Sequence, residues 1–202
     1  MQACGLTAWE LFCRRGDRLL FGSLDLWADR GAAIHLVGPN GIGKTSLLRI
    51  LAGLLRPSLT YFNSPELPAR GRVEWQGSVG FLDGNLALDE HMPLGKALKF
   101  WWAIDKGAAD LDQLGLTSLL EIPVRYLSTG QRKRVALACL IGQSADHWLL
   151  DEPLNGLDTH GVSLVEELVA QKRAEGGVVI VASHQPILLP EAQVIDLRNH
   201  PE

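Results

Sequence analysis

A glycine-rich stretch in the first quarter of the chain limits the possible folds more than any other feature. Residues 38–45 read GPNGIGKT, which fits the pattern G-x-x-x-x-G-K-[ST]. An apolar run, AAIHLVG, precedes the stretch, and leucines at helical spacing follow it as far as Pro57. The loop is therefore expected between a strand and a helix. Its glycines let successive backbone N–H groups point at phosphate oxygens, and the helix adds the positive end of its dipole.

This phosphate loop predicts a nucleotide site. We expect Lys44 to neutralise the outer phosphates and to serve catalysis, and the Thr45 hydroxyl to ligate magnesium. The predicted nucleotide-binding residues of the loop are Gly38, Pro39, Asn40, Gly41, Ile42, Gly43, Lys44, Thr45 and Ser46. The loop alone does not separate a kinase, a switch GTPase and a motor ATPase.

The order of the expected elements indicates an α/β fold. Residues 6–37 read as three strands, residues 57–71 as a loop, and RVEWQ and SVGFL as a strand pair that turns at Gly77. A helical stretch follows at about 93–145. The segments HWLLD, VSLVEELVAQKRA, GVVIVAS and AQVIDL then alternate strand and helix. Strands separated by helices predict a parallel sheet covered on both faces.

Two adjacent carboxylates end the apolar segment HWLLD at residues 147–151. Successive residues of a strand face opposite ways, so Asp151 and Glu152 can have different roles. We expect Asp151 to hold magnesium, directly or through water, and Glu152 to polarise the attacking water. A base beside a metal favours hydrolysis over transfer to a second substrate.

A third segment, YLSTGQ at residues 126–131, opens the helical run RKRVALACLIG. Ser128 or Thr129 is expected to cap this helix. The cap leaves free N–H groups and the bare backbone of Gly130 facing outward. This helix start is a second expected phosphate-binding surface.

With these motifs in order, the sequence resembles the ATP-binding cassette family. LSTGQ differs from the family signature LSGGQ only at Thr129, residues 154–158 (LNGLD) match the D-loop, and His184 matches the switch histidine. The resemblance implies a P-loop NTPase of the ATP-binding cassette type. Such a protein has a parallel-sheet core, an N-terminal antiparallel β subdomain and a helical signature subdomain. We expect one domain over residues 1–202, with the core at 1–84 and 146–202 and the helical subdomain at 85–145.

The resemblance also implies a head-to-tail dimer that binds ATP and Mg²⁺ at two shared sites. In such a dimer the signature residues Ser128, Gly130 and Gln131 bind the γ-phosphate held by the other copy. Asp158 links the two sites, and His184 contacts the γ-phosphate and orients the water.

Two positions depart from the family pattern. Where the family carries a magnesium-binding glutamine, GFLDGN offers Asn85 as the predicted metal ligand, with Asp83 as the alternative. Where the family stacks adenine on an aromatic side chain, this chain has Arg15. Its planar guanidinium can stack on a base, and Phe12 or Trp9 are the alternatives. The family resemblance, and not these residues, implies a preference for ATP over GTP.

Charge and composition exclude several classes of protein. The chain has 202 residues and a formal net charge of -4, which predicts no nucleic-acid partner. The N-terminus lacks the features of a secretory signal, and no apolar run approaches the ~18 residues of a spanning helix. The three cysteines show no metal or redox spacing. We expect structural roles for His35, His91, His147, His160 and His200, and burial for Trp101 and Trp102.

Three features resemble the ATP-binding subunit of the bacterial cytochrome c maturation system, the haem exporter ATPase. They are the short chain, PVRYLSTGQRKRVALACL, and SHQP at residues 183–186. The resemblance implies a peripheral ATPase at the cytoplasmic face of the inner membrane, bound to integral membrane subunits of that system. No haem site is visible in the sequence. The alternatives are the ATPase of another transporter and a soluble nucleotide-dependent regulatory cassette.

Overall fold

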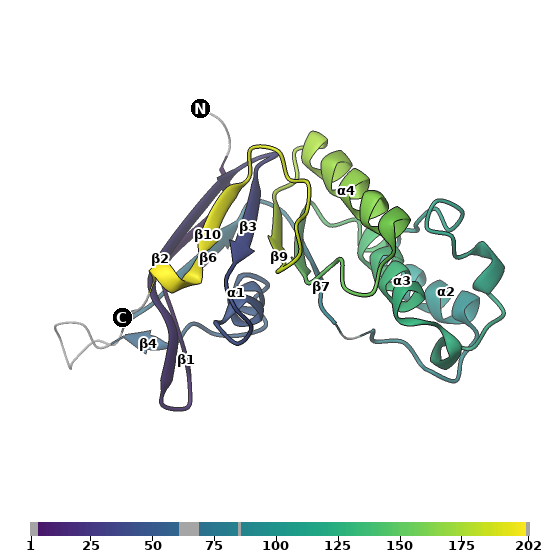
Figure 1. Ribbon diagram of the computed structural model, residues 1–202, viewed down its shortest axis with the longest axis horizontal. Coiled ribbons are helices and arrows are strands. Elements are labelled where there is room, and N and C mark those ends of the chain that lie inside the picture. Colours follow the sequence, from purple (N-terminus) through teal and green to yellow (C-terminus); the bar gives the residue numbers. More distant parts are fainter. Residues whose placement is uncertain (1–3, 61–68, 85, 201–202) are drawn as a thin grey trace.

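The computed structural model in Figure 1 describes residues 4–60, 69–84 and 86–200. Its strands form sheets of three, five and two strands. The three-stranded sheet is antiparallel, with the order β2-β1-β6. It contains β1 (Cys4–Arg15), β2 (Arg18–Asp29) and β6 (Arg72–Trp75). The β1–β2 hairpin turns at Gly16, whose φ of 56° lies in the left-handed region that glycine adopts without strain. The predicted antiparallel N-terminal sheet is therefore present.

The five-stranded sheet is parallel throughout, as the alternation of strands and helices predicted. Its order is β10-β3-β9-β8-β7. It contains β3 (Ala33–Val37), β7 (Val79–Leu82), β8 (His147–Asp151), β9 (Val179–Ala182) and β10 (Gln193–Asp196). Every residue of β8 and β9 is buried, which is typical of parallel strands covered on both faces.

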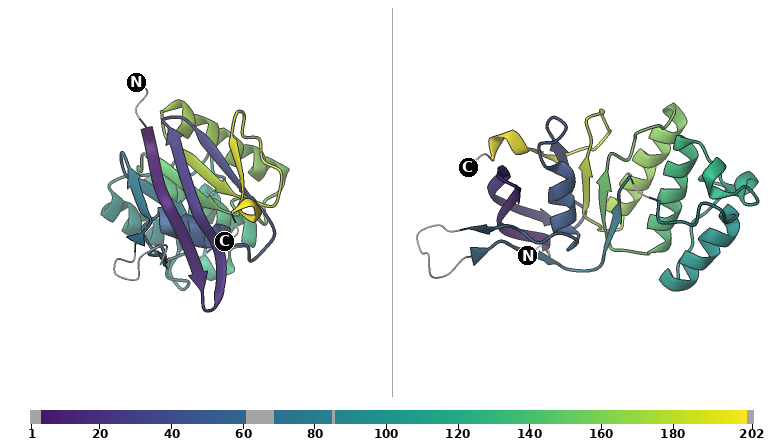
Figure 2. Two further views of the ribbon diagram at one scale, coloured as in Figure 1. Left: turned by 90° about the vertical axis from the view of Figure 1, so that its left-hand side faces the viewer. Right: turned by 90° about the horizontal axis from the view of Figure 1, so that it is seen from below.

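The helices divide between the two faces of this sheet. They are α1 (Lys44–Leu51), α2 (Leu94–Asp105), α3 (Thr129–Gly142) and α4 (Thr159–Ala174), with short 3₁₀ turns η1 (Thr117–Leu119), η2 (Val124–Tyr126) and η3 (Leu197–Asn199). Helix α1 lies near the antiparallel sheet, whereas α2 and α3 gather with α4 at the other end of the molecule (Figures 1 and 2). The expected helical stretch at 93–145 is therefore two helices joined by turns.

Strand β8 contributes to two hydrophobic clusters. Leu149 belongs to the cluster that contains Phe21 of the antiparallel sheet and Leu47 of α1. Its neighbours Trp148 and Leu150 belong to the cluster built with α2, α3 and α4. Because successive side chains of a strand face opposite ways, one strand fills both cores. We propose the division into a core and a helical subdomain at 85–145 because α2 and α3 lie together at one end.

The predicted pairing of RVEWQ with SVGFL is wrong. Strand β6 pairs with β1, whereas β7 pairs with β8 in the other sheet, so the two segments belong to different layers. Gly77 connects them with a φ of 128°. The carboxylate of Asp146 accepts hydrogen bonds from Ser78, at 2.7 Å from the backbone N–H and at 2.8 Å from the hydroxyl. The chain thus crosses from one sheet to the next instead of folding back as a hairpin.

A buried histidine joins the same two sheets. His147 Nδ1 accepts a hydrogen bond from the Val178 N–H at 3.0 Å, so Nε2 carries the proton and donates to the Gln76 carbonyl at 2.9 Å. The imidazole stacks on Trp75 with 5.0 Å between ring centroids. His147 therefore has the structural role that we expected. Among the described residues, no cluster of three or more His, Cys, Asp or Glu side chains suits a metal ion.

No helix in the described ranges combines the length and the apolar character that crossing a bilayer requires. The cysteines whose side chains the structure describes are Cys13, which is buried, and Cys139, which is half-buried; both have free thiols. Burial raises the pKa of the Cys139 thiol to about 11, so at neutral pH it is protonated and unreactive.

Gly77→Ala tests the crossover. A Cβ at this position would lie 2.7 Å from Asp146 Oδ2, and the positive φ strains any L side chain. We expect the free energy of unfolding to fall by roughly 1–3 kcal/mol, measured by urea denaturation. Gly84→Ala is the matched control, because a Cβ there meets nothing within 4 Å. Equal stability of the two variants would show that the crossover does not depend on Gly77.

Asp146→Ala tests the same crossover through pH. The Ser78 backbone and hydroxyl hydrogen bonds lower the pKa of Asp146 in the folded chain. The carboxylate therefore stabilises the fold above the unfolded pKa of about 4, and this stabilisation is lost as the pH falls through the lower folded pKa. We expect the variant to be less stable at pH 7 by about 1 kcal/mol, a small effect because the carboxylate is largely exposed. Urea denaturation at pH 7 and in acid should show the difference shrinking with falling pH; a constant difference would contradict it.

Candidate functional site

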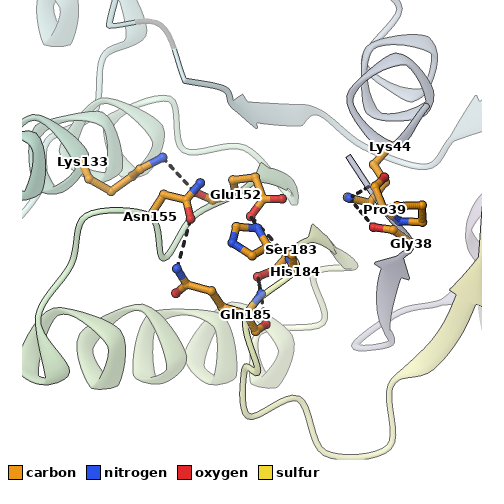
Figure 3. A network of polar contacts seen from close by, with 9 residues as sticks. All are labelled: Gly38, Pro39, Lys44, Lys133, Glu152, Asn155, Ser183, His184 and Gln185. Carbon is orange, nitrogen blue, oxygen red and sulfur yellow. Dashed lines mark hydrogen bonds and ion pairs between the residues drawn. The ribbon is translucent and has the colours of Figure 1, made fainter. Parts of the chain in front are cut away.

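The phosphate loop lies between β3 and α1 and folds around Lys44. The positive φ values of Gly38, Gly41 and Gly43 (131°, 79° and 121°) allow the tight path of the loop. Lys44 is only 6% exposed, and its ammonium donates hydrogen bonds to the carbonyls of Gly38 at 2.7 Å and Pro39 at 3.4 Å (Figure 3). The loop therefore holds one fixed positive charge at the amino end of α1.

A pocket of about 320 Å³ opens at this loop. Many of the residues predicted to bind nucleotide or metal line it: Arg15, Asn40, Gly41, Gly43, Lys44, Thr45, Ser46, Asp151 and Glu152. Arg15 and Leu20 of the β1–β2 hairpin come from a part of the sequence distant from Asp151 and Glu152. They meet at this pocket because the antiparallel sheet, α1 and β8 pack around one hydrophobic cluster. Arg15 is exposed and lines the pocket.

The end of β8 places Asp151 against the start of α1. Asp151 is 8% exposed, and its carboxylate accepts a hydrogen bond from the Thr45 hydroxyl. Burial raises the pKa of Asp151, and the Thr45 hydrogen bond opposes that rise. Two oxygen ligands of the kind that Mg²⁺ prefers thus lie side by side.

Glu152 is the next residue and has an unusual backbone. Its φ of 47° lies in the left-handed region, which is uncommon outside glycine and asparagine. Its N–H donates to the Ala182 carbonyl at 2.8 Å, so the β8–β9 pairing extends to this residue. The left-handed turn directs the carboxylate to His184, whose Nδ1 lies 2.8 Å from Oε2 (Figure 3).

The signature segment lies at the amino end of α3. Ser128 caps the helix and forms a capping box with Gln131: the Gln131 N–H donates to the Ser128 hydroxyl at 3.3 Å, and the Ser128 N–H donates to Gln131 Oε1 at 2.9 Å. Of the two predicted caps, Ser128 is therefore the one used. Gly130 lies against the LNGLD loop, where an added Cβ would be 2.8 Å from the Gly156 carbonyl oxygen.

Ser128, Gly130 and Gln131 do not line the pocket at the phosphate loop of this chain. Asp158 caps α4 by accepting from the Gly161 N–H at 2.8 Å, and it pairs with Arg134 at 3.1 Å. The Gly161 hydrogen bond, followed by the Arg134 charge, lowers the pKa of Asp158.

Asn85, the predicted metal ligand, lies outside the described residues. Its alternative, Asp83, borders a second pocket beside Thr45 and lies 3.9 Å from Arg49.

That second pocket, of about 410 Å³, is lined in part by Lys133, a residue that the sequence analysis did not identify. Thr45, Asp151 and Glu152 line both pockets, and α3 contributes Thr129 and Lys133 to the second. The signal in the sequence was the i, i+4 spacing of Thr129 and Lys133, which places both on one helix face.

The two tryptophans of α2 are half-buried. Trp101 borders a third, mostly apolar pocket of about 380 Å³, and the Trp102 indole N–H donates to the Ala138 carbonyl at 3.4 Å.

Comparison with known proteins agrees with this geometry. Residues 21–155 match the family described as ABC transporter. The cytochrome c biogenesis ATP-binding export protein CcmA of Novosphingobium aromaticivorans is 50% identical over 98% of this chain and 98% of its own length. The protein of that name from Zymomonas mobilis is 42% identical over 96% of this chain and 85% of its own length.

Solved structures share the fold. An ABC transporter ATP-binding protein of Pyrococcus furiosus superposes with a TM-score of 0.76 over 99% of this chain and 100% of that chain, at 20% identity. The predicted cassette fold is thus confirmed, and the chain is an ATP-binding protein and an ATPase of the translocase class. It belongs to the ABC transporter family and, within it, to the family of the cytochrome c biogenesis ATP-binding export protein CcmA.

Proposed function

We propose that this chain hydrolyses ATP to drive a membrane complex that exports or delivers haem during cytochrome c biogenesis. The names of its relatives support the cytochrome c role and the export role. The observation that carries the hydrolytic role is the contact of 2.8 Å between Glu152 and His184 beside the phosphate loop. A carboxylate and an imidazole next to bound phosphates suit the activation of water.

The phosphate loop would hold the phosphates of ATP. Its backbone N–H groups and the Lys44 ammonium supply positive charge where negative charge accumulates during phosphoryl transfer. The adenine ring of ATP would lie toward Arg15, which lines the same pocket. The planar guanidinium of an arginine can stack on an aromatic ring. The phosphate loop and Lys44 would therefore hold the phosphates of the nucleotide, and Arg15 would hold its adenine ring.

Magnesium fits the residues at the end of β8. Thr45 and Asp151 would hold it, because a hydroxyl and a carboxylate already hydrogen-bonded to each other offer hard oxygen ligands. Asn85 is our proposed additional ligand. The ion would neutralise charge on the phosphate oxygens.

Hydrolysis needs a water aligned with the γ-phosphorus. Glu152 would accept a proton from that water, the new P–O bond would form, and ADP would leave with the electrons of the broken bond. Because His184 Nδ1 faces Glu152, its Nε2 is the ring nitrogen left for the γ-phosphate. The pair would thus orient the water and the phosphate together.

A second copy of the chain would complete each site. Ser128, Gly130 and Gln131 lie at the exposed start of α3 and not at the phosphate loop of their own chain. A helix start with free N–H groups suits an anion. In a head-to-tail dimer it would therefore close over the γ-phosphate held by the other copy, with Asp158 near the contact between the sites. ATP would close this dimer, and hydrolysis would reopen it.

The moving helical elements would transmit that cycle to membrane partners. The relatives are named as ATP-binding export proteins, and export across a bilayer would need integral membrane subunits. We place the chain at the cytoplasmic face of the inner membrane, bound to the membrane subunits of the cytochrome c maturation system.

Lys44→Ala and Glu152→Gln should separate binding from hydrolysis. Loss of the Lys44 ammonium should abolish binding of a fluorescent ATP analogue. Glu152→Gln should bind ATP, lower the hydrolysis rate by roughly 100-fold or more, and accumulate as an ATP-bound dimer in size-exclusion chromatography. Glu167→Gln, an exposed glutamate on α4, is the matched control. Hydrolysis by Glu152→Gln at the parental rate would exclude Glu152 as the base.

Co-purification should identify the transport complex. We expect Glu152→Gln, extracted from membranes with detergent in the presence of ATP, to retain its membrane subunits because the closed state does not turn over. Mass spectrometry should find small polytopic proteins of cytochrome c maturation. Other permeases would assign the ATPase to another transporter, and no membrane protein in the ATP-bound sample would favour the soluble regulator.

A further inference from the structure

Lys133 lies at the boundary between the signature helix and the catalytic strand. It is the fifth residue of α3, is half-buried, and borders the pocket that also contains Asp151 and Glu152. Its ammonium donates to the main-chain carbonyl of Glu152 at 3.0 Å (Figure 3). The donor lies on α3, a helix that packs in one core cluster, and the acceptor follows β8, a strand that contributes to both clusters.

This hydrogen bond acts on a strained peptide. Glu152 has a φ of 47°, a conformation that is uncommon for glutamate and persists only where its surroundings hold it. The Ala182 carbonyl fixes the N–H of Glu152 at 2.8 Å, and Lys133 fixes its carbonyl at 3.0 Å. The Asn155 N–H makes a longer contact of 3.4 Å to the same carbonyl. Both polar groups of the Glu152 backbone are therefore held, and Lys133 supplies the only side chain in that set.

Electrostatics explain why a lysine suits this position. Burial lowers the pKa of Lys133, and the negative charges of Asp151, Glu152 and Asp83 oppose that shift. Arg49 lies 3.9 Å from the Asp83 carboxylate. A hydrogen bond from a charged donor is stronger than one between neutral groups, so the ammonium holds the carbonyl more firmly than an amide or hydroxyl would.

Two further contacts join α3 to the loop that follows Glu152. Thr129 and Gly130 lie against Gly156, where a Cβ would meet Thr129 Cγ2 at 2.7 Å. Arg134, one residue beyond Lys133, pairs with Asp158 at 3.1 Å. The signature helix thus holds residues 152–158 at their beginning, middle and end, and Lys133 makes the contact nearest to the carboxylate of Glu152.

We propose that Lys133 is a positioning residue for hydrolysis: from the signature helix, its ammonium fixes the Glu152 carbonyl and so aims the Glu152 carboxylate at the attacking water. The proposal rests on the proposed role of Glu152 as the base. It extends that role because a movement of α3 would change the orientation of the base in the same chain. Lys133 needs no contact with ATP to act in this way.

Lys133→Met tests the proposal, because methionine keeps an unbranched side chain, one atom shorter than lysine, and removes the hydrogen-bond donors. We expect kcat for ATP hydrolysis by the purified full chain to fall roughly 10- to 100-fold, as for other residues that orient a catalytic group. KM and the Kd for ATP should stay near the parental values, since the phosphate loop is unchanged. Lys133→Arg should recover much of the rate, because it retains a charged donor. Lys99→Met, at an exposed lysine of α2, is the matched control.

Each outcome bears on the proposal. A parental kcat in Lys133→Met would overturn it. A rise in KM that matches the loss of rate would also overturn it, because Lys133 would then bind nucleotide. If Lys133→Met does not fold, Lys133→Gln, which is too short to reach the carbonyl, should give the same loss of kcat. The proposed ATPase function is tested separately by the activity of the parental chain and its loss in Glu152→Gln, so the two can fail independently.

Discussion

The burial of β8 between two hydrophobic cores is the constraint on which the rest of the structure depends. Leu149 fills the core beside α1, and Trp148 and Leu150 fill the core beside α3 and α4. A strand packed on both faces cannot shift by one residue without exchanging the two sets of side chains. The position of Asp151 and Glu152 at its end is therefore set by apolar packing along its whole length.

That strand end brings several chemical groups together. Asp151 meets Thr45 of α1, Glu152 meets His184 after β9, and Lys133 reaches Glu152 from α3. The carboxyl ends of neighbouring parallel strands lie at one edge of a sheet, so loops from distant parts of the sequence converge there. The same three residues, Thr45, Asp151 and Glu152, border both pockets of the site.

In the mechanism that we propose, the backbone at Glu152 links catalysis to the position of the signature helix. Its left-handed conformation is held by a strand on one side and by a lysine of the signature helix on the other. Strained residues of this kind are concentrated at functional sites, where surrounding contacts maintain them. We infer that the signature helix affects hydrolysis within its own chain as well as through the proposed contact with a second copy.

The sequence alone determined the features that depend on local chemistry. The phosphate loop follows from glycines that allow positive φ beside a lysine, and the buried strands and amphipathic helices follow from apolar periodicity. The same local patterns placed Asp151 and Glu152 at a strand end, and they offered Ser128 and Thr129 as caps without deciding between them. Only the hydrogen bonds of the folded helix selected Ser128.

The tertiary structure alone decided which segments meet. RVEWQ and SVGFL are adjacent in sequence and resemble a hairpin, yet they pair in different sheets, because β1 and β8 offer them partners that the local pattern does not reveal. Lys133 shares a run of three cations with Arg132 and Arg134, and only the packing of α3 separates their partners, Glu90, Glu152 and Asp158. Propensity and motif spacing act over a few residues. Sheet order and side-chain partners depend on the burial of surfaces that lie far apart along the chain.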